Sequence, residues 1–513
     1  MKLFQNRRLW VLVAAGLGLA LFLGLAARNR LGFPLDDAWI HQTYARNLAR
    51  NGRLEFIPGT SSAGSTAPFW TILLALGYLL RLPYLLWAYL LGGLSLIWLA
   101  WSGMQLWRTL WPTLINRDWI VGVVLVLSWP LLWAAASGME TLFFAAMGLQ
   151  LAAWYIQMMA KAKPTWQQIV RLGFFAGLLI LIRPDGLGLL LLIGLGLLLL
   201  PIPAVRRLKM GGLFVGTAVL PLIPYFLFNF WTSGTLWPNT LYAKQVEYAA
   251  ALAQPFLGRF TQLLYLSLGG SATGWQGISS AHLLLLPGLL FAGWQAVQKD
   301  WKQRRLFYLL PLLWAGGHVF LYAWRLPVTF QHGRYLLPII PIWVIYGFAG
   351  WVLLLLYNSS ESSRTLWLGQ QVARLTFTFI TLFFLLQGAL AYATEVAIIE
   401  GEMVTVARWL AENTPPDTLI ASHDIGAIGY FAERPLLDLA GLISPEVIPL
   451  LQDESALTQY ILNSDARYLV TAPGWPYSQI ANNAATKLRY TTNFSITREQ
   501  GLNNMAVYQL TDQ

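Results

Sequence analysis

The sequence contains no cysteine and little charge. The absence of Cys from its 513 residues excludes disulfide bonds and thiolate metal sites. Lysine, arginine, aspartate and glutamate make up only 11% of the chain, whereas hydrophobic residues make up 57%. A chain of several soluble domains would carry about twice that share of charged residues. The composition therefore excludes a wholly soluble multidomain protein and indicates a membrane protein.

Apolar stretches of about twenty residues recur along the chain, and a helix of that length crosses a bilayer core of about 30 Å. The sequence predicts an all-α polytopic membrane protein with about eleven transmembrane helices. Two shorter apolar segments, 68–80 and 256–269, are expected to form interfacial helices. The expected spans are 9–29, 85–107, 119–137, 140–160, 169–182, 186–202, 210–230, 281–297, 306–324, 335–357 and 372–393.

The net charge of +11 would suit a nucleic-acid-binding protein, but membrane topology also accounts for it. With the N-terminus in the cytoplasm, about half of the 34 basic residues fall in short cytoplasmic connections, as the positive-inside rule requires. Nucleic acid is therefore not an expected partner. The first span starts with basic residues, as a signal peptide does, but its apolar core is too long for one. We expect a retained anchor in the bacterial plasma membrane.

An odd number of spans places the C-terminus on the same extracytoplasmic side as the first loop. We expect a transmembrane region, 1–393, whose first extracytoplasmic loop covers 31–84, and a separate region from 394 to 513. In the latter, the apolar runs TLIAS, RYLVTA and AVYQL alternate with helical stretches such as ESALTQYILNS. This alternation predicts a small extracytoplasmic α/β domain at the C-terminus.

Two adjacent carboxylates, Asp36 and Asp37, follow the end of the first span. Because like charges repel, a nearby cation or hydrogen-bond donor is expected to keep at least one of them ionised. If 36–50 is helical, Asp37 and His41 lie one turn apart on one face, and a carboxylate there is suited to act as a general base. Alternatively, Asp36 simply caps the N-terminus of this helix. The two interpretations are compatible, with one carboxylate in each role.

Further polar residues gather at span ends on the extracytoplasmic side. An ionisable group at membrane depth is costly, and none other than Arg171 is expected inside a span. The cations Arg183, Lys244 and Arg334 would suit a bound phosphate. The candidate binding residues are His41, Glu140, Arg183, Asp185, Asn239, Tyr242, Lys244, His332 and Arg334.

Several of these residues also have a plain structural explanation. A turn accounts for Arg183 and Asp185, because Pro184 and Gly186 suit one, and a helix N-terminus accounts for Glu140. His332 lacks a second metal ligand at a suitable spacing, so no metal site is expected there. The sequence has no phosphate-binding glycine loop between a strand and a helix, so no nucleotide is expected.

Five segments together resemble a known family. The loop LDDAWIHQTYARNLARNGRLEFIPGTSSAGSTAPFW resembles the first extracytoplasmic loop of GT-C glycosyltransferases, polytopic enzymes that use polyprenyl-phosphate sugars. SGMET, RPDG, LWPNTLYAK and HDIGAIGYF…LLDLAGLISPE are similar to the bacterial branch that includes the mycobacterial terminal arabinofuranosyltransferase and the RgtA-like enzymes. The resemblance covers nearly the whole chain, and SSAGST departs from the bulkier stretch usual in the branch.

The resemblance implies a GT-C fold and inverting transfer of a sugar from a polyprenyl-phosphate donor. The acceptor would be a cell-wall polysaccharide, a glycolipid or a protein. Asp36 or Asp37 would be the base or the acceptor anchor, and we favour Asp37 as base because His41 can orient it. The three cations would balance the charge of the departing phosphate. The resemblance allows a divalent metal ion at the acidic pair without requiring one.

Other functions are compatible with parts of the pattern. A lipid or solute transporter would explain the many spans, although the repeats and midplane polar groups common in transporters are not evident. An O-antigen-ligase-like enzyme would also use a lipid-linked donor, and a non-catalytic scaffold would leave the polar rim unexplained. In the C-terminal region, His423 and Asp424 fit a simple turn or a contact to the acceptor.

Overall fold

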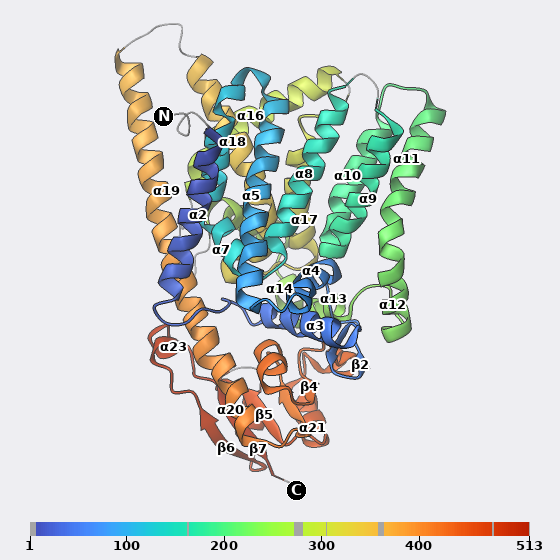
Figure 1. The fold of residues 1–513 in the computed structure, drawn as a ribbon, viewed down its shortest axis with the longest axis vertical. Helices are drawn as coiled ribbons and strands as arrows, with labels where there is room; N and C mark the ends of the chain where they lie inside the picture. The colour runs from blue at the N-terminus through green and yellow to red at the C-terminus, as the bar shows by residue number, and fades with distance from the viewer. Residues whose placement is uncertain are drawn as a thin grey trace.

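The protein is a bundle of upright helices with a small mixed α/β domain at one end (Figure 1). The computed structural model describes residues 7–161, 164–270, 281–303, 305–357, 364–474 and 477–511. The long helices stand side by side, and the C-terminal strands lie below them in the view of Figure 1. A layer of shorter helices lies between the bundle and this domain, so three levels follow one another along the long axis.

The upright helices lie where the sequence predicts spans. They are α2 (Arg7–Ala26), α5 (Tyr84–Leu110), α6 (Asp118–Val126), α7 (Trp129–Ala136), α8 (Thr141–Met159), α9 (Trp166–Ile182), α10 (Leu187–Leu198), α11 (Ala204–Val219), α12 (Ile223–Ser233), α16 (Leu286–Gln303), α17 (Leu310–Arg325), α18 (Ile340–Tyr357) and α19 (Arg364–Ile399). Within the described residues, six helices are long and apolar enough to cross a membrane, or seven if a bent pair counts as one span. The chain is therefore a multi-pass membrane protein.

Proline occurs inside two of the expected spans; the first bends sharply, and the second continues as one long span through an irregular turn. The span expected at 119–137 bends by 59° between α6 and α7, and Pro130 lies in the first turn of α7. The span expected at 210–230 contains a 3-10 turn, Leu220–Leu222, between α11 and α12. Proline lacks a backbone N–H and clashes with the preceding turn, so a proline inside a helix favours a bend or an irregular turn at that point.

Short helices form the layer below the bundle. They are α3 (Asp37–Asn51), α4 (Pro68–Leu79), α13 (Asn239–Glu247) and α14 (Ala249–Leu252), whereas α15 (Phe256–Gly269) packs against α17 of the bundle. The helix expected at 36–50 is α3, and the interfacial helices expected at 68–80 and 256–269 are α4 and α15. A short hairpin, β1 (Glu55–Ile57) and β2 (Thr60–Ser61), follows α3 and was not predicted. This layer carries several of the candidate site residues.

The C-terminal domain contains a five-stranded sheet in the order β4-β3-β5-β7-β6. Strands β3 (Ile420–Ser422), β5 (Tyr468–Thr471) and β7 (Ala506–Leu510) are the three that the sequence predicts, whereas β4 (Leu436–Asp438) and β6 (Thr486–Thr491) were not singled out. β3 pairs in parallel with β4 and β5, and β7 pairs antiparallel with β5 and β6. The helices of the domain are α20 (Thr405–Asn413), α21 (Glu454–Leu462), α22 (Ser478–Ala481) and α23 (Ser495–Glu499). The domain is therefore α/β, as predicted.

The bundle joins the C-terminal domain through helical backbone. Helix α19 runs past residue 394, where the sequence predicts the domain to begin, and continues through a π-helical turn (Glu400–Val404) into α20. Helix α20 ends at Asn413, directly before the turn that contains two prolines, Pro415 and Pro416. A helix without a loop at this point couples the two parts more closely than a flexible linker would.

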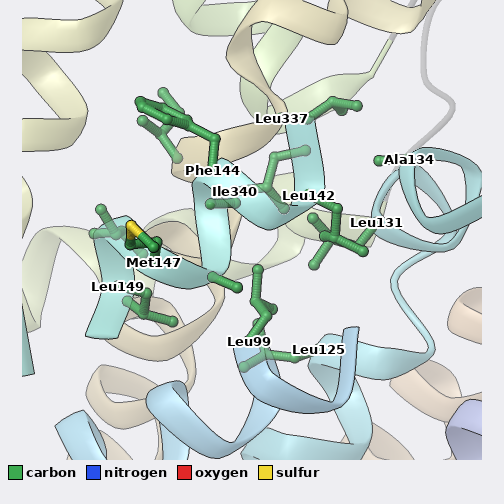
Figure 2. Close-up of a cluster of buried hydrophobic side chains, with 14 of the residues drawn as sticks. Leu99, Leu125, Leu131, Ala134, Leu142, Phe144, Met147, Leu149, Leu337 and Ile340 are labelled. Atoms are coloured by element: carbon green, nitrogen blue, oxygen red, sulfur yellow. The ribbon is translucent and has the colours of Figure 1, made fainter. Parts of the chain in front are cut away.

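A buried apolar core lies among the upright helices (Figure 2). Side chains from α5, α6, α7, α8, the 3-10 segment η5 (Gln331–Ile339) and α18 meet there, among them Leu99, Leu125, Leu131, Ala134, Leu142, Phe144, Met147, Leu149, Leu337 and Ile340. A Cβ atom at Gly92 of α5 would lie 1.8 Å from the carbonyl oxygen of Ala135 in α7, so only glycine permits this helix contact. The core fixes the first turn of α8 and the segment η5, which carry Glu140 and Arg334 next to it.

Candidate active site

A cavity of about 660 Å³ lies between the bundle and the layer of short helices. Helices α3, α10, α13 and α17 and the loops that precede α8, α10 and α18 all contribute to its wall. The cavity brings together seven of the candidate residues: Asp37, His41, Glu140, Arg183, Asp185, Lys244 and Arg334. These residues are up to 297 positions apart in the sequence, so tertiary structure alone assembles them.

The acidic pair divides at the start of α3. Asp36 turns away from the cavity, where its Oδ2 accepts a hydrogen bond from the backbone N–H of Gly426 (2.7 Å) and its Oδ1 one from Ala427 (2.8 Å). Asp36 occupies the N-cap position of α3 but makes no side-chain bond to that helix, so the prediction that it caps α3 is wrong. Burial and the nearby charge of Asp424 raise the pKa of Asp36 to about 8, although the two hydrogen bonds lower it.

Asp37 faces the cavity. Its Oδ2 lies 2.5 Å from Nη2 of Arg334, and about a third of its side chain (30%) is exposed. Burial alone would raise the pKa of Asp37, but the positive charges of Arg334 and Lys244 outweigh that effect and hold it below its usual range. Asp37 is therefore an ionised carboxylate at neutral pH, open to whatever occupies the cavity.

A buried network of charged groups lies behind Asp37. Nε2 of His41 lies 3.1 Å from Glu140, and Nη1 of Arg183 donates to the other oxygen of Glu140 at 2.7 Å. Nε of Arg183 also donates to Asp185 (3.1 Å), and the Tyr322 hydroxyl donates to Asp185 at 2.9 Å. Two carboxylates therefore neutralise Arg183, which is 7% exposed. The turn expected around Pro184 is present as a 3-10 turn (Pro184–Gly186), and it is also part of this network.

Three other cations line the cavity, and within the residues that the structure describes each is paired with fewer carboxylates than Arg183 is. Arg334 pairs with one carboxylate, and its Nε and Nη1 have no hydrogen-bond partner among the described residues. Lys244 makes no ion pair within 4 Å in the described part of the chain. Burial lowers the pKa of Lys244, but Tyr335 and Asp37 raise it by more. The pKa is therefore above its usual value, and the amine is charged. Arg325 at the end of α17 completes the set. An anion in the cavity would meet a net positive wall.

Four candidate residues lie outside the cavity. Asp36 contacts the C-terminal domain, and the backbone N–H of buried Asn239 donates to the carbonyl oxygen of Ala63. The side chain of Tyr242 is 39% exposed. Nε2 of His332 lies 2.6 Å from a carboxylate oxygen of Glu395. His332 has a left-handed backbone (φ 57°) two residues before Arg334, so this contact steadies the turn that presents Arg334.

Helix α17 supplies site residues that the sequence analysis missed. His318, Tyr322 and Arg325 line the cavity, and His318 lies 3.9 Å from Asp185 while its Nε2 contacts the carbonyl oxygen of Tyr335. The expectation that no ionisable group but Arg171 lies inside a span is therefore wrong, because His318 is in the middle of α17. The sequence did contain a signal for this site, because an ionisable residue within an apolar helix is unusual and commonly functional.

The acidic pair does not form a metal site. Among the described residues, no group of three or more His, Asp or Glu side chains is arranged to hold a metal ion. Both carboxylate oxygens of Asp36 accept backbone N–H groups, and the guanidinium of Arg334 lies where a cation beside Asp37 would have to bind. The donor set at this position therefore does not fit the divalent ion that the family resemblance allows.

Comparison with known proteins identifies the fold. A family model described as a domain of unknown function (DUF8728) matches residues 389–508, and no curated protein sequence matches the chain. ArnT from Cupriavidus metallidurans, solved with undecaprenyl phosphate, is similar with a TM-score of 0.57 and 15% identity over 98% of each chain. The oligosaccharyltransferase AglB from Archaeoglobus fulgidus, solved with an inhibitory peptide and a dolichol-phosphate, gives 0.60 and 11% over 90% of this chain and 69% of that chain. The chain therefore shares its fold with these two solved proteins, which confirms the polytopic helical fold that the family resemblance implies.

Proposed function

We propose that the protein is a glycosyltransferase that moves a sugar from a polyprenyl-phosphate donor to the hydroxyl group of an extracytoplasmic acceptor. One observation carries the proposal. A single cavity has an ionised carboxylate and free cations at one end and an apolar groove at the other. A lipid-linked sugar phosphate has the same division into a polar head and an apolar tail. The two solved relatives named above contain a polyprenyl or dolichol phosphate.

The apolar end of the cavity lies between α10 and α17. Leu187 and Leu191 of α10 are 41% and 61% exposed, and Phe320 and Trp324 of α17 are 52% and 57% exposed. All four line the cavity. Because such side chains in a membrane protein face lipid, the groove opens sideways into the bilayer. A prenyl tail can therefore enter from the membrane plane while its phosphate reaches the charged end.

The charged end supports the chemistry of transfer. Lys244 and Arg334 would bind the donor phosphate, and Asp37 would take the proton of the acceptor hydroxyl. The acceptor oxygen then bonds to the anomeric carbon from the face opposite the phosphate, which inverts the configuration. The bond from that carbon to the phosphate oxygen breaks, and its electron pair leaves with polyprenyl phosphate. Asp37 suits the role of base better than Asp36 does, because both oxygens of Asp36 already accept backbone N–H groups.

The positive-inside rule supports the orientation of the molecule. The N-terminus and the basic connections would lie in the cytoplasm of a bacterial cell, and the cavity and C-terminal domain would lie outside its plasma membrane. Nucleotide sugars are cytoplasmic, so an enzyme with this orientation needs a donor that is carried across on a lipid. The acceptor is then a cell-wall glycan, a glycolipid or a protein that shares this compartment.

Turnover of a labelled donor tests the proposal. Purified protein in nanodiscs would receive a panel of radiolabelled polyprenyl-phosphate sugars, with extracts of cell-envelope glycans, glycolipids and proteins as acceptors. We expect release of polyprenyl phosphate with one donor and label in one acceptor fraction. Movement of the intact donor across a vesicle membrane without cleavage would instead establish a transporter. Absence of both cleavage and binding for every donor would overturn the proposal.

The groove allows a sharper test with matched glycine substitutions. Gly188 of α10 lines the cavity, and a Cβ atom there would meet no atom within 4 Å. Gly188→Leu therefore adds a side chain to the groove with no clash at its Cβ atom, and we expect KM for a long-chain donor to rise about threefold to tenfold, the effect of losing one or two buried methylene contacts. Gly216→Leu in α11 has equal space but lies outside the cavity, and it should leave KM unchanged. An equal KM in both variants would contradict the proposal that the prenyl tail of the donor lies in the groove.

A further inference from the structure

Helix α3 holds one segment of the C-terminal domain at both ends. The segment runs from Gly426 to Glu433 and forms a helical turn. At its start, Asp36 accepts the backbone N–H groups of Gly426 and Ala427. At its end, Nη1 of Arg46 donates to the carbonyl oxygen of Tyr430 (2.7 Å) and to Glu433 (2.6 Å). A carboxylate thus meets free N–H groups, and a guanidinium meets free carbonyl groups, as helix ends favour.

The start of the segment lies in close contact with the start of α3. A Cβ atom at Gly426 would lie 2.1 Å from the backbone oxygen of Asp36, so no larger residue fits there. Between the two ends, the ring of Trp39 lies 4.7 Å from the ring of Phe431 and 5.1 Å from that of Tyr430. Trp39 is 1% exposed. From Asp36 to Arg46, α3 therefore packs against the segment, and it does so with side chains that the mechanism does not use.

The opposite side of α3 carries the groups proposed for chemistry. Asp37 and His41 line the cavity, one helical turn apart. Because α3 is a rigid helix, the contacts at Asp36 and Arg46 also fix where Asp37 stands relative to Arg334. A displacement of about 1 Å at a reacting group can cost a hundredfold in rate.

We infer that Asp36 is a positioning residue, which together with Arg46 anchors α3 on the C-terminal domain and thereby sets the place of Asp37 in the cavity. The inference rests on the proposed function. It assigns the two adjacent carboxylates to different tasks, one to assembly and one to catalysis. It also makes the C-terminal domain a structural part of the active site, whatever acceptor it contacts.

Cross-linking tests this inference because the chain has no cysteine of its own. Arg50 of α3 and Glu433 of the segment have exposed side chains whose charged atoms lie 3.7 Å apart. A protein with Arg50→Cys and Glu433→Cys can be joined there by a short bismaleimide. It loses the bond from Arg46 to Glu433 but keeps those from Arg46 to the carbonyl oxygens of Tyr430 and Gly429, so every variant is compared with this parent protein. In this background we expect Asp36→Asn to lower kcat at least tenfold with KM for the donor changed less than threefold. Covalent joining should restore kcat to within threefold of the joined parent protein.

Glu402 provides the matched control. It is a buried carboxylate that also anchors the C-terminal domain, since it accepts hydrogen bonds from the backbone N–H of Met505 (2.8 Å) and from Asn504 (2.6 Å), but these bonds do not involve α3. Glu402→Gln should leave the cross-linking yield between the two cysteines unchanged, whereas Asp36→Asn and Gly426→Ala should lower it.

Each outcome decides between the alternatives. Loss of kcat in Asp36→Asn that joining does not restore, with a normal cross-linking yield, would show that Asp36 acts chemically and overturn the inference. An unchanged kcat would overturn it as well. If the parent protein turned over no donor, the proposed function would fail, and the cross-linking yields alone would then show whether Asp36 anchors α3.

Discussion

The two sides of α3 differ in how completely their carboxyl groups are satisfied. On the side that faces the C-terminal domain, both oxygens of Asp36 accept hydrogen bonds; Arg46 donates to three acceptors there, although its Nε has no partner among the described residues. On the cavity side, Arg334 is the one hydrogen-bond partner of the Asp37 side chain among the described residues, and 30% of that side chain is exposed; Nδ1 of His41 has no partner within the same residues. Saturated groups hold structure together, whereas unsaturated groups remain able to bind a substrate. Adjacent identical residues therefore acquire different roles from their surroundings alone.

The largest effect is expected on the cavity side. Asp37→Asn removes the proposed base while keeping the shape of the side chain, and we expect kcat to fall by about 10²–10⁴-fold in a protein that still folds, with a lower Tm because buried Arg334 loses its ion pair. Release of polyprenyl phosphate from a labelled donor measures it. Asp118→Asn is the matched control, because Asp118 also pairs with an arginine, Arg108, at the start of a helix outside the cavity. Full activity of Asp37→Asn would remove the distinction between the two sides.

Lys244→Met should have the next largest effect. It removes a cation that forms no ion pair with any described residue, and a charged hydrogen bond to a phosphate contributes about 1.5–3 kcal/mol. We therefore expect KM for the donor to rise about tenfold to a hundredfold, with a smaller change in kcat. Lys209→Met in α11, which is exposed and outside the cavity, serves as the control. A normal KM in the Lys244 variant would show that Lys244 does not bind the phosphate.

On the other side of α3, a substitution should affect stability more than binding. Arg46→Gln leaves buried carbonyl groups without a donor, and we expect a loss of about 1–3 kcal/mol in stability, seen as a lower Tm. KM for the donor should stay unchanged. Arg50→Gln is the control, since Arg50 lies near the same carboxylate of Glu433 but its side chain is 62% exposed. If Arg46→Gln changed KM and left Tm alone, the assignment of the two sides would be reversed.

Measured over one pH unit, the pH dependence of stability should be the smallest of these effects. Burial, and then the charge of Asp37, raise the pKa of Asp424 to about 7 from an unfolded value of 3.8. The unfolded chain therefore releases this proton first as pH rises. The contribution of Asp424 to stability should fall between about pH 4 and 7 and level off above, by at most about 1.4 kcal/mol per pH unit, and Asp36, whose pKa is also raised, adds to this fall. Asp424→Asn should flatten a plot of Tm against pH, and an unchanged slope would show that other groups cause it.

Much of the fold could be predicted from the sequence because each signal is local. Apolar stretches of span length mark the upright helices, and the alternation after residue 413 marks the C-terminal sheet. The interruption near Pro130 was missed because an apolar run with one proline still has the composition of a span. The strands β4 and β6 were missed because each is short or largely exposed.

The candidate site was predictable only in part. Residues at span ends, such as Glu140 and Lys244, are conspicuous because charge is rare in this chain. The roles of Asp36 and Asp37 were not separable, because the partners of Asp36 lie about 390 positions away. Tyr322 was missed because a tyrosine in an apolar helix has no distinctive pattern, and only the fold places it against Asp185.

The sideways opening of the groove between α10 and α17 has a consequence for how the reaction must be measured. If the donor enters from within the bilayer, its effective concentration is its mole fraction in the membrane, that is, the number of donor molecules per lipid molecule. The volume of the aqueous phase does not change that ratio. Adding inert lipid at constant protein and donor should slow the reaction, whereas adding buffer should not. Rates from detergent micelles and from nanodiscs are therefore comparable only at equal mole fractions of donor.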